Sequence, residues 1–292
     1  MSAGGALLVD KPAGPTSHDV VAHVRRALGR GTRVGHAGTL DPFATGLLIV
    51  LYGRSTRLAP YLTGLDKRYR VVAQLGARSD SGDRDGVLEP VPDAVPPAED
   101  RLRELVGSLV GELDQVPPTT SAIHIDGRRA HELHRAGQVV EMPVRRVHVY
   151  DLSLVAYDRE TARATLDVHC SKGTYVRALV RDLGELAGCG AYCDALRRTA
   201  SGPLEIASAG DLSAIEADPT GGPWALSPAA AVVHLPARDL APDEQTAIGF
   251  GRPLELRGEE GPTRCLAGDR LVCIAEPADG VLRPKVVLEP AA

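Results

Sequence analysis

Apolar residues follow two different periods along this chain, and the two periods separate expected strands from expected helices. Short runs in which every residue or every second residue is apolar predict buried or half-buried strands. Runs of this kind cover residues 7–9, 47–51, 69–75, 152–157 and 165–170. Apolar residues spaced three or four apart predict amphipathic helices, and they occur at 19–28, 99–109 and 175–186. Thr16 or Ser17 can cap the first of these helices.

The character of the chain changes toward its C-terminus. Proline, glycine and alanine become frequent from about 217 to 235, which predicts a linker. Two short β-like runs follow at 270–275 and 284–288, between glycine and proline turns. This spacing predicts a small β-barrel of roughly 55 residues. We therefore place a domain boundary between a large domain, 1–232, and a small one, 233–292.

The composition of the 292 residues is that of an ordinary globular protein, with 43% hydrophobic and 24% charged residues. No apolar run approaches the roughly 18 residues that a membrane-spanning helix needs. Residues 1–10 lack the pattern of a secretion signal, so a cytoplasmic location is expected. The five cysteines include no CxxC pair, and we expect neither a disulfide nor a metal site. A polar, acidic loop at 79–86 lacks the terminal glutamate of a calcium loop, and a solvated turn is expected there.

Charge is distributed unevenly along the chain. The net charge is −5, but residues 201–292 hold 7 Lys and Arg against 14 Asp and Glu, whereas the first 200 residues hold 26 against 24. Arginines gather within 25–33, 128–146, 177–181 and 197–198. Because guanidinium groups suit bidentate phosphate contacts, four such clusters favour an RNA-facing surface over separate solvated helix faces.

One segment stands out chemically. Residues 35–46 read Gly-His-Ala-Gly-Thr-Leu-Asp-Pro-Phe-Ala-Thr-Gly and lead directly into the apolar run 47–51. The segment holds a single carboxylate, Asp41, on a loop rooted in an expected buried strand, which is a usual way to present a reactive group. By residue type alone, an ordinary surface turn explains the segment equally well.

Other segments resolve this ambiguity, because together they resemble one family. Residues 35–46 are similar to the catalytic motif of the TruB family of tRNA pseudouridine synthases. The sequence Asp-Lys-Pro-Ala-Gly at 10–14 resembles the N-terminal motif of that family. Asp-Lys-Arg-Tyr-Arg at 66–70, Cys-Ser-Lys-Gly-Thr-Tyr-Val-Arg at 170–177 and Ala-Leu-Arg-Arg at 195–198 match further motifs in the same order.

The resemblance implies a role for each matching position. Asp41 would be the nucleophile, Tyr69 would stack on the target base and abstract a proton, and Arg177 would pair with the nucleophile. His36 would fill the space left by the flipped-out nucleotide. The remaining implied substrate-binding residues are Lys11, Tyr175 and Leu196.

The chemistry implied by the family fits a single conspicuous acid. Pseudouridine formation breaks the bond from ribose C1′ to uracil N1, turns the base and rejoins it through C5, so it requires no cofactor or metal. A glycoside hydrolase uses two carboxylates and admits water, whereas an isomerase needs one nucleophile and must retain the base.

The resemblance also implies fold, substrate and partners. The implied fold is α+β: a pseudouridine synthase domain with a mixed, largely antiparallel sheet flanked by helices and loops, and a PUA-like C-terminal barrel. An insertion at 117–147, for which we expect a strand, a turn and a helix, would grip the T stem-loop of tRNA. The implied reaction is conversion of uridine 55 by a monomer, without guide RNA or an obligate protein partner. A non-catalytic RNA-binding module, a nucleoside N-glycosidase and a guide-dependent relative are the alternatives.

Overall fold

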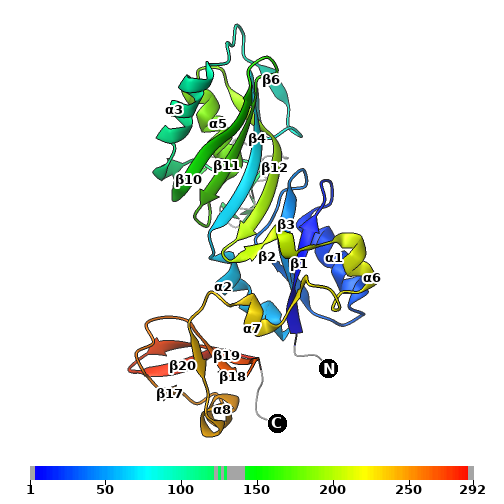
Figure 1. Cartoon of the computed structure of the whole chain (residues 1–292), viewed down its shortest axis with the longest axis vertical. Helices are drawn as coiled ribbons and strands as arrows, with labels where there is room; N and C mark the ends of the chain where they lie inside the picture. The colour runs from blue at the N-terminus through cyan, green and yellow to red at the C-terminus, as the bar shows by residue number, and fades with distance from the viewer. Residues whose placement is uncertain (1–3, 122–123, 126–127, 130–141, 289–292) are drawn as a thin grey trace. The chain divides into compact units, whose positions relative to one another are not determined.

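The computed structural model describes residues 4–121, 124–125, 128–129 and 142–288. It divides into two compact units, one combining Met1–Leu65 with Ala200–Ala292 and the other formed by Asp66–Thr199. Helices and strands occur in both units (Figure 1), which confirms the predicted α+β class. A separate domain beginning at 233 stays a prediction.

The elements of the first unit come from both ends of the chain. In order they are β1 (Gly4–Lys11), α1 (Ser17–Ala27), β2 (Val34–Ala37), β3 (Thr45–Gly53), the 3₁₀ helix η1 (Arg54–Leu58), α2 (Ala59–Thr63), β13 (Leu204–Glu205), the 3₁₀ helix η2 (Ile206–Ser208), β14 (Gly210–Asp211), α6 (Leu212–Ala217), β15 (Ala225–Leu226), α7 (Pro228–Ala231), β16 (Ala237–Asp239), α8 (Pro242–Gly249), β17 (Leu254–Glu255), β18 (Thr263–Ala267), β19 (Arg270–Ala278) and β20 (Val281–Val287).

Strand β1 is the centre of the first unit. It pairs antiparallel with β3 on one side, and parallel with β14 and antiparallel with β15 on the other. Strand β2 extends the pairing beyond β3. Because β1 and β3 are covered on both faces, nearly all of their residues are buried, which explains their uninterrupted apolar runs.

Helix α1 covers this sheet and begins where the sequence predicts a cap. Thr16 accepts a hydrogen bond from the amide of Asp19, and the Asp19 carboxylate accepts one from the Thr16 amide, a reciprocal capping box. Val20, Val21 and Val24 are buried, and the helix packs on β2, β3 and α6. The helix predicted at 19–28 is thereby confirmed, with its start two residues earlier.

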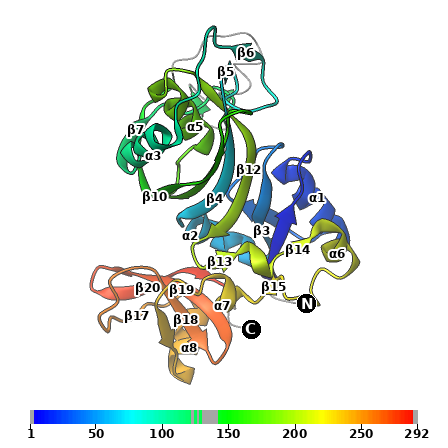
Figure 2. The same cartoon turned by 45° about the horizontal axis from the view of Figure 1, so that its top comes forward.

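The C-terminal strands form a curled five-stranded sheet in the order β16-β18-β19-β20-β17 (Figure 2). It surrounds its own apolar core, which includes Ile248, Cys273 and Leu282. This half-barrel confirms the small β-structure predicted from the runs at 270–275 and 284–288.

The linker predicted at 217–235 is wrong. Ala225 and Leu226 pair with β1, and Ala229 and Val232 of the α7 region pack in one cluster with Leu271 and others from the C-terminal sheet. Small residues allow this close packing, so the alanine-rich composition that predicts a linker instead reflects buried contacts.

The second unit contains the following elements, with the last two residues of β12 assigned to the first unit: β4 (Lys67–Leu75), β5 (Ala77–Ser79), β6 (Leu88–Pro90), α3 (Glu99–Ser108), β7 (Gly111–Gln115), β8 (His124–Ile125), β9 (Arg128–Arg129), β10 (Arg145–Asp158), β11 (Arg163–Cys170), α5 (Val176–Leu186) and β12 (Ala191–Ser201).

In this unit the strand order is β12-β4-β11-β10-β7, and the pairs from β4 to β7 are antiparallel. Alternate residues of β4 and β11 are buried, and α3 and α5 cover that face, packing on β10 and β4 (Figure 1). The helix expected within the insertion 117–147 lies outside the described residues.

Candidate active site

Asp41 lies on the short loop between β2 and β3, and this loop is anchored on both sides of the carboxylate. Before it, the Leu40 amide donates to Ser17 Oγ (2.9 Å), which in turn donates to the Leu40 carbonyl (3.0 Å). After it, the Pro42 carbonyl accepts a 2.8 Å hydrogen bond from the Gly14 amide. Asp41 itself is half-buried. These bonds use the main chain, so they fix the loop without engaging the carboxylate.

Lys11 supplies the strongest anchor of the loop. Its side chain has no exposed area, and its Nζ donates to the carbonyls of Pro12 (2.9 Å), Pro42 (3.1 Å) and Ala44 (2.7 Å). A buried ammonium must be compensated by hydrogen bonds, and two of the carbonyls that compensate Lys11, those of Pro42 and Ala44, belong to the loop that carries Asp41. Direct binding of substrate by Lys11 is the sequence-based prediction; its complete burial leads us to propose a positioning role in its place.

His36 lies on β2, directly before this loop. Its ring packs edge-to-face against that of His18 in the first turn of α1, with centroids 5.3 Å apart and an interplanar angle of 86°. His36 is half-buried and His18 is exposed. His18 is not predicted from the sequence as a site residue, because a histidine at a helix start has no distinctive spacing.

Tyr69 lies on β4 in the second unit, where it pairs with Val168 of β11. It is half-buried and shares a strand face with Lys67, two residues earlier. Burial, followed by the nearby charge of Arg198, lowers the pKa of Lys67 to about 8. The surroundings of Tyr69 therefore include a lysine that is easily deprotonated.

Tyr175 and Leu196 hold defined positions in the same unit. Tyr175 is the N-cap of α5, and both of its backbone groups bind the buried Gln115 side chain: its amide donates to Oε1 (2.8 Å) and its carbonyl accepts from Nε2 (3.1 Å). Leu196 lies on β12 and is buried. A strand at 191–201 is not predicted from the sequence, because its buried positions include polar residues such as Arg198.

Arg177, in the first turn of α5, is almost completely buried, with 3% of its surface exposed. Its Nη1 lies 3.0 Å from Asp83 Oδ2 and also donates to the Ser81 carbonyl (2.7 Å) and to Thr120 Oγ1 (2.6 Å). The predicted pairing of Arg177 with Asp41 joins residues of different units and stays a prediction.

The solvated turn predicted at 79–86 is wrong at its centre. Ser81 and Asp83 are buried, at 8% and 6% exposure, and the Asp83 carboxylate accepts hydrogen bonds from Ser81 Oγ (2.7 Å) and the Asp85 amide (3.1 Å) as well as from Arg177. A buried guanidinium requires a counter-charge, and this loop provides one. Three acidic residues within a turn give no sequence signal that one of them is buried.

Comparison with known proteins decides the family. A model described as the N-terminal domain of TruB family pseudouridylate synthase matches residues 25–176, and a model of the tRNA pseudouridylate synthase B C-terminal domain matches 177–218. The chain belongs to the TruB family. The fold and motif resemblance inferred from the sequence are confirmed by this match.

Curated relatives of this TruB family member match over nearly their whole length. "tRNA pseudouridine synthase B" of Azoarcus sp. (strain BH72) is 43% identical over 287 residues, covering 96% of this chain and 93% of the relative. The proteins of the same name from Synechococcus sp. (strain CC9311) and Mycobacterium sp. (strain KMS) are 39% and 41% identical and cover 98% and 99% of this chain and 97% of each relative.

Solved structures support the fold. A chain in an H/ACA RNP bound to a substrate RNA containing 2′-deoxyuridine has a TM-score of 0.75 at 22% identity, with 98% of this chain and 85% of that chain covered. A chain of a Cbf5-Nop10-Gar1 complex has a TM-score of 0.74 at 23% identity, with the same coverage. At this level of identity the likeness concerns the fold alone.

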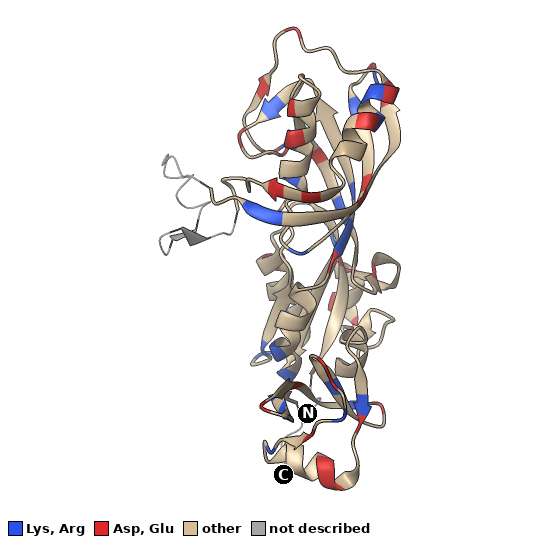
Figure 3. Cartoon of the chain, turned by 90° about the vertical axis from the view of Figure 1, so that its left-hand side faces the viewer, with Lys and Arg blue, Asp and Glu red and all other residues tan. Residues whose placement is uncertain are grey.

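The arginine clusters of this TruB family member are partly neutralised. Strand β10 opens with two exposed basic residues, visible as a blue strand start in Figure 3. One of them, Arg146, lies 3.3 Å from Asp114, and elsewhere in the unit Arg70 pairs with Asp167 at 2.8 Å.

In the part of the chain that the structure describes, no helix has the length and apolar character needed to cross a membrane.

Proposed function

We propose that this protein converts uridine 55 in the T-loop of tRNA to pseudouridine, acting without guide RNA. Family membership supports pseudouridylate synthesis, and the curated relatives are named tRNA pseudouridine synthase B. The observation that carries the proposal to particular atoms is the Asp41 loop, whose main chain is held by Lys11, Ser17 and Gly14.

In the proposed reaction Asp41 acts as the nucleophile. Uridine 55 is flipped out of the T-loop, which costs unstacking energy that contacts in the pocket must recover. Attack by the Asp41 carboxylate and cleavage of the C1′–N1 bond release the uracil from the ribose. The base turns, and its C5 forms the C1′–C5 bond as the bond between C1′ and the Asp41 carboxylate breaks. The C5 proton is then removed, with Tyr69 as the proposed acceptor, and N1 gains a proton. No electron or external group is transferred, so the step balances without a cofactor.

The other proposed roles follow from the same chemistry. Tyr69 provides a face on which the detached uracil stacks, worth about 1–3 kcal/mol. Arg177 supplies a fixed positive charge that favours the ionised form of a neighbouring acid. Tyr175 and Leu196 would contact the substrate, and His36 would occupy the space that the flipped nucleotide leaves. The T stem-loop would be held through its shape, as RNA loops generally are, with the insertion 117–147 as the gripping segment.

Tritium release tests the proposal directly. An unmodified tRNA transcript carrying [5-³H]uridine should release tritium to solvent, with one equivalent per tRNA at completion and none when uridine 55 is replaced by cytidine. Absence of release by folded protein would overturn the enzyme assignment. Free uracil in solution would instead show an N-glycosidase, and dependence on an added RNA would show a guided enzyme.

The Asp41→Asn variant tests the assignment of the nucleophile. We expect turnover below detection, because the amide is not nucleophilic, while tRNA affinity in a filter-binding assay stays within about twofold of wild type. The melting temperature should change little, since the loop is anchored through the main chain of Leu40 and Pro42. Normal turnover in this variant would place the nucleophile elsewhere.

A further inference from the structure

The guanidinium of Arg177 is held from two directions. One side belongs to the loop after β5, where the Ser81 carbonyl and the Asp83 carboxylate accept from Nη1. The other side belongs to Thr120, whose hydroxyl accepts from Nη1 at 2.6 Å and whose carbonyl accepts from Nη2 at 3.3 Å. Among these partners, Thr120 contacts both terminal nitrogens. A two-point contact fixes the plane of a guanidinium as well as its position.

The Thr120 hydroxyl also joins the two sides to each other. While it accepts from Arg177, it donates to the Ser81 carbonyl at 3.4 Å. The same carbonyl accepts from Arg177. Arg177, Ser81 and Thr120 thus close a three-membered ring of hydrogen bonds, in which the hydroxyl takes part both as donor and as acceptor.

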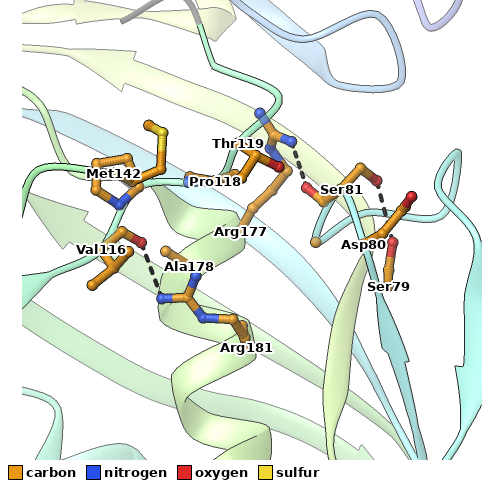
Figure 4. A pocket seen from close by; sticks show the side chains of 12 residues that line it. Ser79, Asp80, Ser81, Val116, Pro118, Thr119, Met142, Arg177, Ala178 and Arg181 are labelled. Atoms are coloured by element: carbon orange, nitrogen blue, oxygen red, sulfur yellow. Dashed lines mark hydrogen bonds between the residues drawn. The ribbon is translucent and has the colours of Figure 1, made fainter. Parts of the chain in front are cut away.

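Thr120 is itself held in place by its local chain. The buried Pro117 and Pro118 precede it by three and two residues, and proline fixes its own backbone torsion and restricts the residue before it. This segment lines a pocket of about 210 Å³ together with the loop after β5 and one side of α5 (Figure 4). The chain that leads into Thr120 is therefore stiff.

We propose that Thr120 is a positioning residue for the pseudouridylation reaction, acting through Arg177. This inference rests on the proposed function, in which Arg177 carries the charge beside the nucleophile. Loss of the hydroxyl leaves the guanidinium buried and bound to Asp83, Ser81 and the main-chain carbonyl of residue 120. It removes one acceptor from Nη1 and the link to the Ser81 carbonyl, so the group is held less rigidly. Thr120 also lies near the start of the segment 117–147 proposed to grip RNA, so the residue that orients Arg177 belongs to the RNA-holding part of the chain.

The main experiment compares three variants in single-turnover tritium release. Thr120→Val removes the hydroxyl at nearly constant shape, and we expect the rate constant to fall about tenfold, as is typical of losing a hydrogen bond to a charged group, with the tRNA dissociation constant within about twofold. Thr120→Ser should restore most of the rate. Thr165→Val is the matched control, because Thr165 of β11 lies in the same unit, is half-buried like Thr120 and takes no part in the ring of hydrogen bonds; it should react like wild type.

Three results would overturn the inference while the proposed function stands: a wild-type rate for Thr120→Val, a serine variant as slow as the valine variant, or a Thr165→Val variant equally slow. A wild type that releases no tritium would overturn the proposed function instead.

Nitrogen NMR of [¹⁵N]arginine-labelled protein tests the positioning without reference to activity. A clamped guanidinium rotates slowly about its Nε–Cζ bond and gives separate signals for its two terminal nitrogens. We expect slow exchange between the two Arg177 signals in wild type and in Thr120→Ser, and faster exchange in Thr120→Val. Equal exchange rates in all three proteins would show that the Thr120 hydroxyl does not hold the group.

Discussion

The Asp41 loop and the Arg177 side chain are both held in place by hydrogen bonds, but through different groups. The loop is held through its main chain, by Lys11, Ser17 and Gly14 binding backbone groups on either side of the acid. Arg177 is held through its functional group, which Asp83, Ser81 and Thr120 bind directly. The proposed nucleophile reacts through its carboxylate, whereas the proposed orienting cation works best when its own atoms are fixed. The two regions should therefore respond differently to substitution.

The largest stability effect is expected at Asp83. Asp83→Asn leaves the Arg177 charge buried without its carboxylate, and breaking one side of a buried ion pair typically costs about 3–5 kcal/mol. Turnover should fall as well, because the guanidinium loses a fixed partner. Chemical denaturation and tritium release measure the two effects. Asp85→Asn, at an exposed position in the same loop, is the control and should be near neutral; an Asp83→Asn protein as stable as wild type would contradict the comparison.

A somewhat smaller effect is expected at Lys11. Lys11→Met removes the donor for three carbonyls, two of them in the Asp41 loop. We expect the free energy of unfolding to fall by about 2–4 kcal/mol, because removing a buried charge offsets part of the loss of these hydrogen bonds. The rate constant should fall while tRNA affinity stays near wild type. Lys285→Met, on the exposed face of β20, controls for loss of a lysine. If the variant instead bound tRNA more weakly at an unchanged rate constant, the result would support the direct contact between Lys11 and substrate that the sequence predicts.

The smallest effect concerns Lys67. Burial lowers the pKa of its ammonium group from 10.5 to about 8. Between these two values the unfolded chain binds more protons than the folded protein, so the free energy of unfolding should rise with pH from about 8 to about 10.5. Lys67→Met should be more stable than wild type at pH 7, by about 2 kcal/mol after allowing for residual solvent, and this advantage should vanish near pH 10.5. Thermal melts across this range measure the difference.

Lys67→Arg provides the control for this pH dependence. An arginine stays charged throughout the range, so the rise in stability between pH 8 and pH 10.5 should disappear in this variant. Wild-type stability that is flat over the same range would show that Lys67 keeps an ordinary pKa.

Prediction from sequence succeeds where a local pattern and a local structure coincide. The apolar runs at 7–9 and 47–51 lie within β1 and β3 because strands covered on both faces have no polar side to show. Helix α1 begins with the capping box that Thr16 and Asp19 provide. The motif around Asp41 identifies the family because many positions are fixed within twelve residues.

Prediction fails where burial depends on partners distant in sequence. Arg198 and Asp83 are polar residues that the sequence assigns to the surface, yet both are buried, at 2% and 6% exposure. Asp83 is buried because Arg177, 94 residues later, supplies its counter-charge. The linker prediction for 217–235 fails for a related reason. The segment has the composition of a linker, but two of its residues, Ala225 and Leu226, pair with β1.

The sequence by itself determined the family, the position of the acid on a loop before a buried strand, and most of the strands and helices, since each depends on residues close together in the chain. Only the tertiary structure decided how the proposed catalytic groups are held: Lys11 turned inward onto the Asp41 loop, and Arg177 enclosed by Asp83, Ser81 and Thr120. Those contacts are hydrogen bonds and ion pairs between segments that only folding brings within about 3 Å of one another, and no local spacing encodes them.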